Sequence, residues 1–106
     1  MARVVWSSSA AADLEEIINW MADHHSNQTA GSFIDRIDTE ITRLPGYPES
    51  GRIIPELERQ NIPKYREIII SPWRVFYMVE NDRVAILAVI DGRRNVEDII
   101  LRRNIR

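Results

Sequence analysis

The sequence predicts a single α+β domain over residues 1–106, and three observations support that class. Two successive segments near the N-terminus repeat apolar residues at helical spacing. Three later runs are rich in β-branched and aromatic residues and are separated by turn-forming residues, as β-strands are. A chain of 106 residues can bury one hydrophobic core but not two. We therefore expect the order βααβββ, followed by a short C-terminal helix.

The N-terminal part is expected to form a short strand and a pair of helices. Arg3 to Trp6 is a short apolar run, and a serine among residues 7–9 can cap a helix that continues to about His24. The polar residues 24–27 link it to a second helix over about residues 28–44. Each helix has one apolar stripe, so the pair predicts an antiparallel hairpin that covers a sheet. The stripe residues are Ala10, Leu14, Ile17, Ile18, Met21, Ala30, Phe33, Ile34, Ile37, Ile41 and Leu44.

The middle of the chain is rich in turn-forming residues and contains one short predicted strand. Residues 52–54 can form that strand, which should end at Pro55 because proline has no amide hydrogen to donate to a ladder. The next eight residues, 56–63, are mostly polar. They predict a mobile loop between the short strand and the main sheet.

The main sheet is expected from three β-rich runs in the C-terminal half. Period-two alternation places Trp73 and Tyr77 on one face of the sheet and Arg74 on the opposite face. The last run is apolar on both faces, which indicates a central strand, and Asn95 can cap the short helix after it. The runs are residues 65–70, 73–80 and 84–90, with Asn81 and Asp82 as the hairpin turn between the last two.

Charge is divided unevenly along the chain, although the net charge is only -2. Residues 1–50 carry 3 basic and 8 acidic side chains, whereas residues 51–106 carry 11 basic and 8 acidic ones. Thirteen of the 14 cations are arginine, whose planar guanidinium suits phosphate and carboxylate partners. The basic half therefore indicates an anionic partner, and an arginine-rich genome explains it equally well. The overall acidic balance argues against uniform coating of nucleic acid.

Several classes of protein and site are excluded. No apolar run approaches the ~18 residues that a membrane span needs, so no transmembrane helix is expected. The N-terminus lacks the apolar core of a secretory signal, and with the absence of cysteine this favours the cytoplasm. No GxSxG, Walker A, GxGxxG or HExxH motif occurs, and no cofactor is expected. His24 and His25 share no helix face and have no third histidine, so no metal site is expected.

Arginines in and after the predicted strands are the remaining candidates for chemistry. They could clamp a phosphodiester and stabilise developing charge, or they could hold an acidic peptide. A solvated surface without a binding role is the third interpretation, and the residues alone leave all three open. Asp13, Glu15 and Glu16 are interpreted as solvated charges that a helix dipole favours. The arginine set is Arg66, Arg74, Arg93 and Arg94, with Tyr65, Glu67 and Tyr77 nearby.

Short motifs run in a recognisable order through nearly the whole chain. They are W-S (6–7), A-x-D-L-x-x-I (11–17), A-x-x-F-I (30–34), L-x-x-x-P (44–48), G-R-x-x-P-E-L (51–57), Y-R-E-I (65–68), W-R-V-F-Y (73–77) and G-R-R (92–94). In this order they resemble the RelE/ParE superfamily of toxins from type II toxin–antitoxin modules. The resemblance implies a RelE-like, microbial-RNase-type fold, in which an N-terminal helical hairpin packs on an antiparallel sheet. It also implies growth arrest, plasmid stabilisation and a cognate antitoxin, with assembly as a homodimer or a toxin–antitoxin heterotetramer.

The two branches of this superfamily differ in their target. RelE-like toxins cleave mRNA on the ribosome, whereas ParE-like toxins poison DNA gyrase. The RelE arginines match Arg66, Arg74 and Arg94, which are the catalytic candidates if the protein is an RNase. Its proton-transfer lysine falls on Ile68, and its catalytic tyrosine falls near Ile100. Because isoleucine can neither take nor give a proton, these two positions leave enzymatic activity uncertain.

We therefore expect a ParE-like toxin that poisons DNA gyrase and is neutralised by a cognate antitoxin, because G-R-x-x-P-E-L and G-R-R resemble the ParE branch more closely. Two alternatives remain open. One is a RelE-like ribosome-dependent mRNA endonuclease, with the ribosome and mRNA as partners. The other is a non-toxic interaction domain of the same fold. The target-binding candidates are Arg52, Arg66, Arg74, Tyr77, Arg93 and Arg94.

Overall fold

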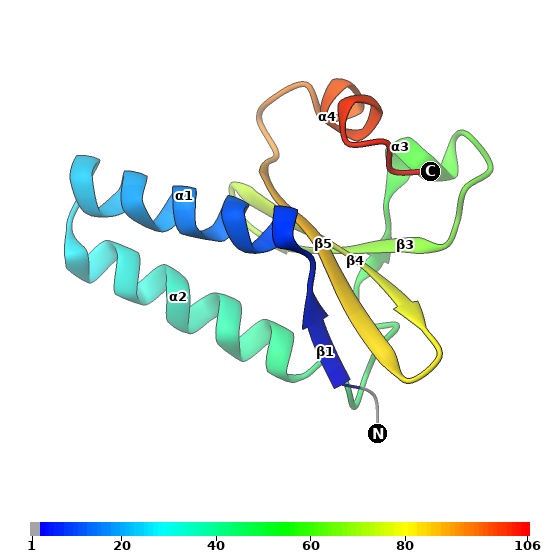
Figure 1. Cartoon of the computed structure of the whole chain (residues 1–106), viewed down its shortest axis with the longest axis horizontal. Coiled ribbons are helices and arrows are strands. Elements are labelled where there is room, and N and C mark those ends of the chain that lie inside the picture. The colour runs from blue at the N-terminus through cyan, green and yellow to red at the C-terminus, as the bar shows by residue number, and fades with distance from the viewer. Residues whose placement is uncertain (1–2) are drawn as a thin grey trace.

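A computed structural model describes residues 3–106 and shows an α+β fold with helices on both faces of one sheet (Figure 1). The elements are β1 (Arg3–Trp6), α1 (Ser8–His24), α2 (Asn27–Thr42), β2 (Arg52–Ile53), α3 (Pro55–Glu58), β3 (Tyr65–Ile70), β4 (Trp73–Glu80), β5 (Arg83–Asp91) and α4 (Val96–Arg102). The predicted fold class, the helical hairpin and the short C-terminal helix are confirmed. Helices α1 and α2 cover one face of the sheet, and α3 and α4 lie on the other.

The five strands lie in the order β1-β5-β4-β3-β2. Strands β2 to β5 pair antiparallel, as expected, and β4 is the middle strand. The first strand differs from the expectation of an antiparallel sheet, because β1 pairs with β5 in parallel, with Arg3 opposite Arg83 and Trp6 opposite Ile86. A parallel pair needs a long connection between its strands, and here everything from α1 to β4 provides it.

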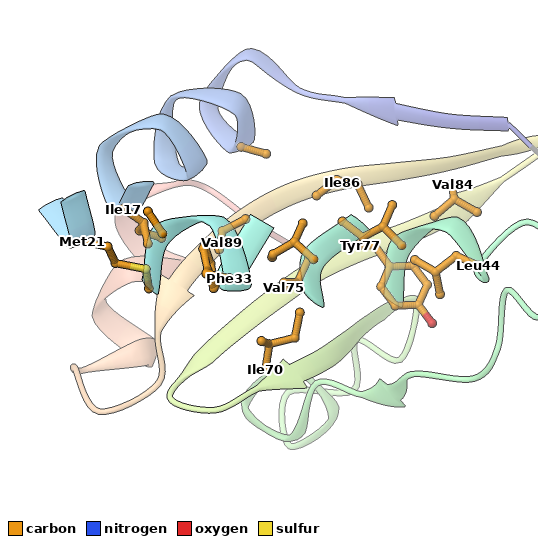
Figure 2. Close-up of a cluster of buried hydrophobic side chains, with 14 residues drawn as sticks. Ile17, Met21, Phe33, Leu44, Ile70, Val75, Tyr77, Val84, Ile86 and Val89 are labelled. Atoms are coloured by element: carbon orange, nitrogen blue, oxygen red, sulfur yellow. The ribbon is translucent and has the colours of Figure 1, made fainter. Parts of the chain in front are cut away.

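The helical hairpin forms where the sequence predicts it, and its ends are set by serine caps. The Ser7 hydroxyl accepts a hydrogen bond from the Ala10 amide at 3.0 Å, and the Ser26 hydroxyl accepts one from the Thr29 amide at 3.0 Å. The apolar stripes pack on β3, β4 and β5, as Figure 2 shows for the buried cluster between hairpin and sheet. Ile34 is the exception, because its side chain is 42% exposed.

A bulge lets β5 contribute apolar side chains to both faces. Phe76 lies opposite Ala88 and Tyr77 lies opposite Ile86, so Leu87 is an extra residue on β5 that shifts the alternation. Ile86 therefore faces the helical hairpin, whereas Ala88 belongs to a second buried cluster under α3 and α4. The prediction of an interior strand that is apolar on both faces is confirmed.

The interpretation of residues 56–63 as a mobile loop is wrong at its N-terminal end. Pro55 begins the one-turn helix α3, where its missing amide hydrogen costs nothing. Leu57 of this helix is fully buried in the cluster under α3 and α4. A single apolar residue among polar neighbours has no period that sequence reasoning can detect, so only its tertiary contacts define the helix.

Gly51 marks a point of close backbone approach between the β2 segment and the sheet. A Cβ atom at residue 51 would lie 2.6 Å from both the Glu67 carbonyl oxygen and the Tyr77 hydroxyl oxygen. Both neighbours lie in the sheet and are buried, so they cannot move aside. The glycine of the G-R-x-x-P-E-L motif is therefore required by packing.

We expect Gly51→Ala to lower the free energy of unfolding by ~1–3 kcal/mol, because the added methyl group overpacks a buried contact. Gly31→Ala is the matched control, since a Cβ atom at this position of α2 would meet nothing within 4 Å. It should raise the free energy of unfolding by roughly 0.5–1 kcal/mol through helix propensity. Urea denaturation measures both, and equal effects of the two substitutions would contradict the role of Gly51.

Candidate functional site

A buried ion-pair network lies on the sheet face that α3 covers. Glu67 of β3 is 1% exposed, and Arg74 is buried beside it on the neighbouring strand β4. The Arg74 Nε atom lies 2.5 Å from Glu67 Oε1, and its Nη2 atom lies 3.0 Å from Oε2. Glu56 of α3 accepts from the other side of the guanidinium, at 2.8 Å from Nη1 and 2.7 Å from Nη2. Arg52 of β2 completes the network, with its Nε 2.7 Å from Glu67 Oε2.

The hydrogen bonds between Arg74 and Glu56 stabilise the charged forms of these two residues. Hydrogen bonds to Glu56, followed by those to Glu67, raise the pKa of Arg74 well above its ordinary value. The hydrogen bond from Arg74 lowers the pKa of Glu56 below its ordinary value, against the smaller opposing effect of burial. Two arginines and two glutamates make the network neutral overall, and the attraction between them offsets the desolvation cost of burying the Glu67 carboxylate.

Arg66 and Tyr77 lie on the opposite face of the sheet from Arg74. Strand alternation places Arg66 on the side of Ile68, which packs against the helical hairpin. The Arg66 Nη1 atom donates to the Gly51 carbonyl at 2.8 Å. Tyr77 is fully buried, and its hydroxyl donates to the Pro48 carbonyl at 2.8 Å and accepts from the Gly51 amide at 2.9 Å. Burial raises the pKa of Tyr77, so this phenol stays neutral and holds the segment before β2.

Arg93 and Arg94 lie beside an open hollow of about 630 Å³ between α1 and α4. Arg93 pairs with Asp91 at 3.0 Å, and its hydrogen bonds lower the pKa of that carboxyl. Arg94 is exposed and makes no ion pair within residues 3–106. The hollow is lined by both apolar and charged side chains. Its lining includes Glu16, Ile17, Trp20, Trp73, Ile99 and Arg102.

Asp13 joins α1 to both β5 and α4, a role that sequence reasoning missed. Strand β1 ends at Trp6, so the outer edge of β5 is uncovered beyond it. Asp13 Oδ2 accepts from the Val89 amide on this edge at 3.0 Å, and Oδ1 pairs with Arg103. The interpretation of Asp13 as a solvated, dipole-favoured charge is therefore wrong. Its place in the A-x-D-L-x-x-I motif was the available signal.

The structure does not bring the six candidate residues to one site. Arg52 and Arg74 share Glu67 on the face under α3, and Arg66 and Tyr77 lie on the other face. Arg93 and Arg94 follow β5 beside the hollow. Sequence reasoning also missed Glu56, because it assigned the residue to a loop. Within residues 3–106, no three acidic or histidine side chains group as metal ligands.

The α+β fold described above is the one that the resemblance to the RelE/ParE superfamily implies, and a comparison with protein families tests that resemblance. A profile described as "ParE toxin of type II toxin-antitoxin system, parDE" matches residues 4–96. The chain therefore belongs to the ParE toxin family of type II toxin–antitoxin systems.

Two comparisons with individual proteins agree with this family. Toxin ParE3 of Caulobacter vibrioides is 28% identical over 96 residues, which cover 91% of this chain and 92% of that protein. A solved structure described as "Chromosomal ParDE TA system from P. aeruginosa" has the same fold, with a TM-score of 0.70 at 20% identity. The match covers 86% of this chain and 95% of the solved one. None of the helices within residues 3–106 has the length and apolar character to cross a membrane.

Glu67→Gln should lower the free energy of unfolding by ~3 kcal/mol. The buried Arg74 guanidinium would then keep only one of its two carboxylate partners. The matched control is Glu40→Gln, which removes the exposed 2.6 Å pair with Arg43. That change should stay within about 0.5 kcal/mol. Denaturant unfolding at neutral pH distinguishes the two, and a Glu67→Gln value as small as that of the control would contradict the network's role.

The lowered pKa of Glu56 predicts an acid sensitivity with a definite sign. Since the folded pKa lies below the ordinary value of 4.5, the Glu56–Arg74 pair stabilises the protein fully above about that pH. This stability is lost as the pH falls through the folded pKa. We expect Glu56→Gln to show a shallower loss of stability on acidification than the wild type. The matched control is Glu58→Gln. Glu58 lies on the same helix and has no ion pair among residues 3–106, so the stability of this variant should depend on pH as that of the wild type does.

Proposed function

We propose that this toxin poisons DNA gyrase and is neutralised by a cognate antitoxin. The observation that carries the proposal is the packing of Ile68 and Ile100, the two positions where an RNase of this superfamily would need proton-transfer groups. Ile68 packs against the helical-hairpin cluster, and Ile100 is 5% exposed in the cluster under α4. An isoleucine in either place can neither accept nor donate a proton, which supports binding to a target over cleavage of RNA.

The placement of the arginines supports the same proposal. Stabilising a phosphodiester during cleavage requires several donors aimed at one group of oxygens. Arg66 and Arg74 project from opposite faces of the sheet, and the Nε, Nη1 and Nη2 atoms of Arg74 all donate to glutamates. Arg94 follows β5 and lines the hollow. Because Arg66 and Arg74 lie on opposite faces of the sheet, the three arginines do not converge on one phosphodiester.

Contact with the target is assigned to the exposed arginines. Arg52, Arg93 and Arg94 present cationic side chains to solvent, whereas Arg74 and Tyr77 act by holding the sheet and the segment before β2 in place. Exposed charges at an interface raise the rate of association and select the partner. Arg94 is the strongest candidate among them, since Arg52 and Arg93 are each paired with a carboxylate.

The antitoxin is proposed to pack against the helical hairpin and the sheet, with an acidic tail on the arginine-rich sheet side. The family profile describes a toxin of a toxin–antitoxin system, and the solved structure of the same fold is described as a ParDE system. An arginine-rich C-terminal half is complementary to such a tail. A homodimer or a toxin–antitoxin heterotetramer is the assembly we propose, and a gyrase target places the toxin in the cytoplasm.

Purified toxin should inhibit supercoiling by DNA gyrase and should leave mRNA on programmed ribosomes intact. Arg94→Ala should weaken the inhibition about tenfold, the loss of roughly 1.4 kcal/mol of binding. The matched control is Arg36→Ala. Arg36 lies on α2, is exposed and has no ion pair within the described chain, so this variant should inhibit gyrase as well as the wild type does. Adding the antitoxin should restore supercoiling. If the toxin cleaves mRNA and leaves supercoiling normal, the gyrase proposal is wrong and the protein is a ribosome-dependent RNase.

A further inference from the structure

Arg74 keeps its position through contacts that do not involve α3. Glu67 holds the Nε side of the guanidinium from the adjacent strand at 2.5 Å and 3.0 Å. The Phe76 ring centroid lies 5.5 Å from the guanidinium carbon. Gly92 closes the other side, since a Cβ atom on it would lie 2.9 Å from Arg74 Cδ. The aliphatic stem and one edge of the guanidinium are therefore held by the sheet and by the turn after β5.

The remaining edge of the guanidinium points to Glu56. Its Nη1 and Nη2 atoms donate to the two oxygens of this carboxylate at 2.8 Å and 2.7 Å. This two-point geometry is the one by which arginine binds phosphate as well as carboxylate. The Glu56 side chain is 15% exposed, whereas that of Glu67 is fully buried, so Glu56 lies on the solvent side. It comes from a helix of only four residues.

We propose that Arg74 is an oxyanion-binding site that Glu56 occupies as an internal ligand. The charges of the network sum to zero over Arg52, Arg74, Glu56 and Glu67. Removal of Glu56 therefore leaves a net charge of +1 around a guanidinium fork, the Nη1 and Nη2 edge of Arg74, that is already oriented. An anion of the phosphate class fits this fork, because it offers two oxygens in the plane of the guanidinium. Glu56 therefore blocks this site, because its carboxylate occupies the Nη1 and Nη2 donors that a dissolved anion would use. This inference does not depend on the identity of the toxin's target.

The test is a titration of Glu56→Ala with inorganic phosphate at neutral pH, with ionic strength held constant by chloride. Binding is followed on the side-chain Nε–H resonance of Arg74. We expect half-saturation on the order of 1 mM for the variant. The wild type should bind about tenfold more weakly or not at all, because its own carboxylate fills the site.

Glu58→Ala is the matched control, because it removes the same charge from the same short helix with no ion pair to lose among residues 3–106. It should behave like the wild type. Binding by Glu58→Ala as tight as by Glu56→Ala, or phosphate binding that leaves the Arg74 resonance unmoved, would show general attraction to a less acidic surface and overturn the proposal.

Glu56→Gln keeps the test decisive if the alanine variant unfolds, since the amide preserves the size of the side chain and removes its charge. Circular dichroism establishes that each variant is folded. A folded Glu56→Gln should still bind phosphate more tightly than the wild type, though more weakly than Glu56→Ala, because the amide oxygen can accept one guanidinium hydrogen bond. If both variants are folded and neither binds phosphate, the proposal is wrong.

Discussion

The burial of Glu67 is the constraint on which the rest of this structure depends. A carboxylate that is 1% exposed is tolerated only with charged partners, and Arg74 and Arg52 supply them from the two strands that flank β3. Because the Glu67–Arg74 pair must be shielded from water and well oriented, the backbone has to pack closely against it. Gly92 lies at such a point, since a Cβ atom on it would lie 2.9 Å from Arg74 Cδ, whereas Gly51 approaches the Glu67 backbone carbonyl and the Tyr77 hydroxyl.

The sheet separates two environments, and this separation decides what the arginines can do. One face is an apolar surface for the helical hairpin, with Tyr77 bonded to the backbone before β2. The other face combines an apolar cluster under α4 with the ion-pair network under α3. Arg66 on β3 and Arg74 on β4 thus lie on opposite faces of the sheet. The proposed function, binding of a target through exposed charges, needs no convergent catalytic centre.

Helix α1 contributes to this arrangement as more than a cover for the core. Its Asp13 carboxylate bonds the edge of β5 that β1 leaves uncovered and also holds Arg103 beyond α4. The C-terminal helix is consequently tied to the N-terminal hairpin across the end of the sheet. The hollow that Arg94 lines lies between these two helices, so its shape depends on the same contacts.

Sequence alone determined the elements whose cause is local or periodic. The apolar stripes of the hairpin, the serine cap of α1, the three main strands and the Asn95 cap follow from spacing and from backbone hydrogen bonding, and all of them are present. Tertiary structure decided the rest. The parallel pairing of β1, the helix around Leu57 and the partners of Asp13, Glu56 and Arg74 depend on residues far apart in the chain. Whether a charge is solvated or buried is set by what packs over it, and no local pattern records that.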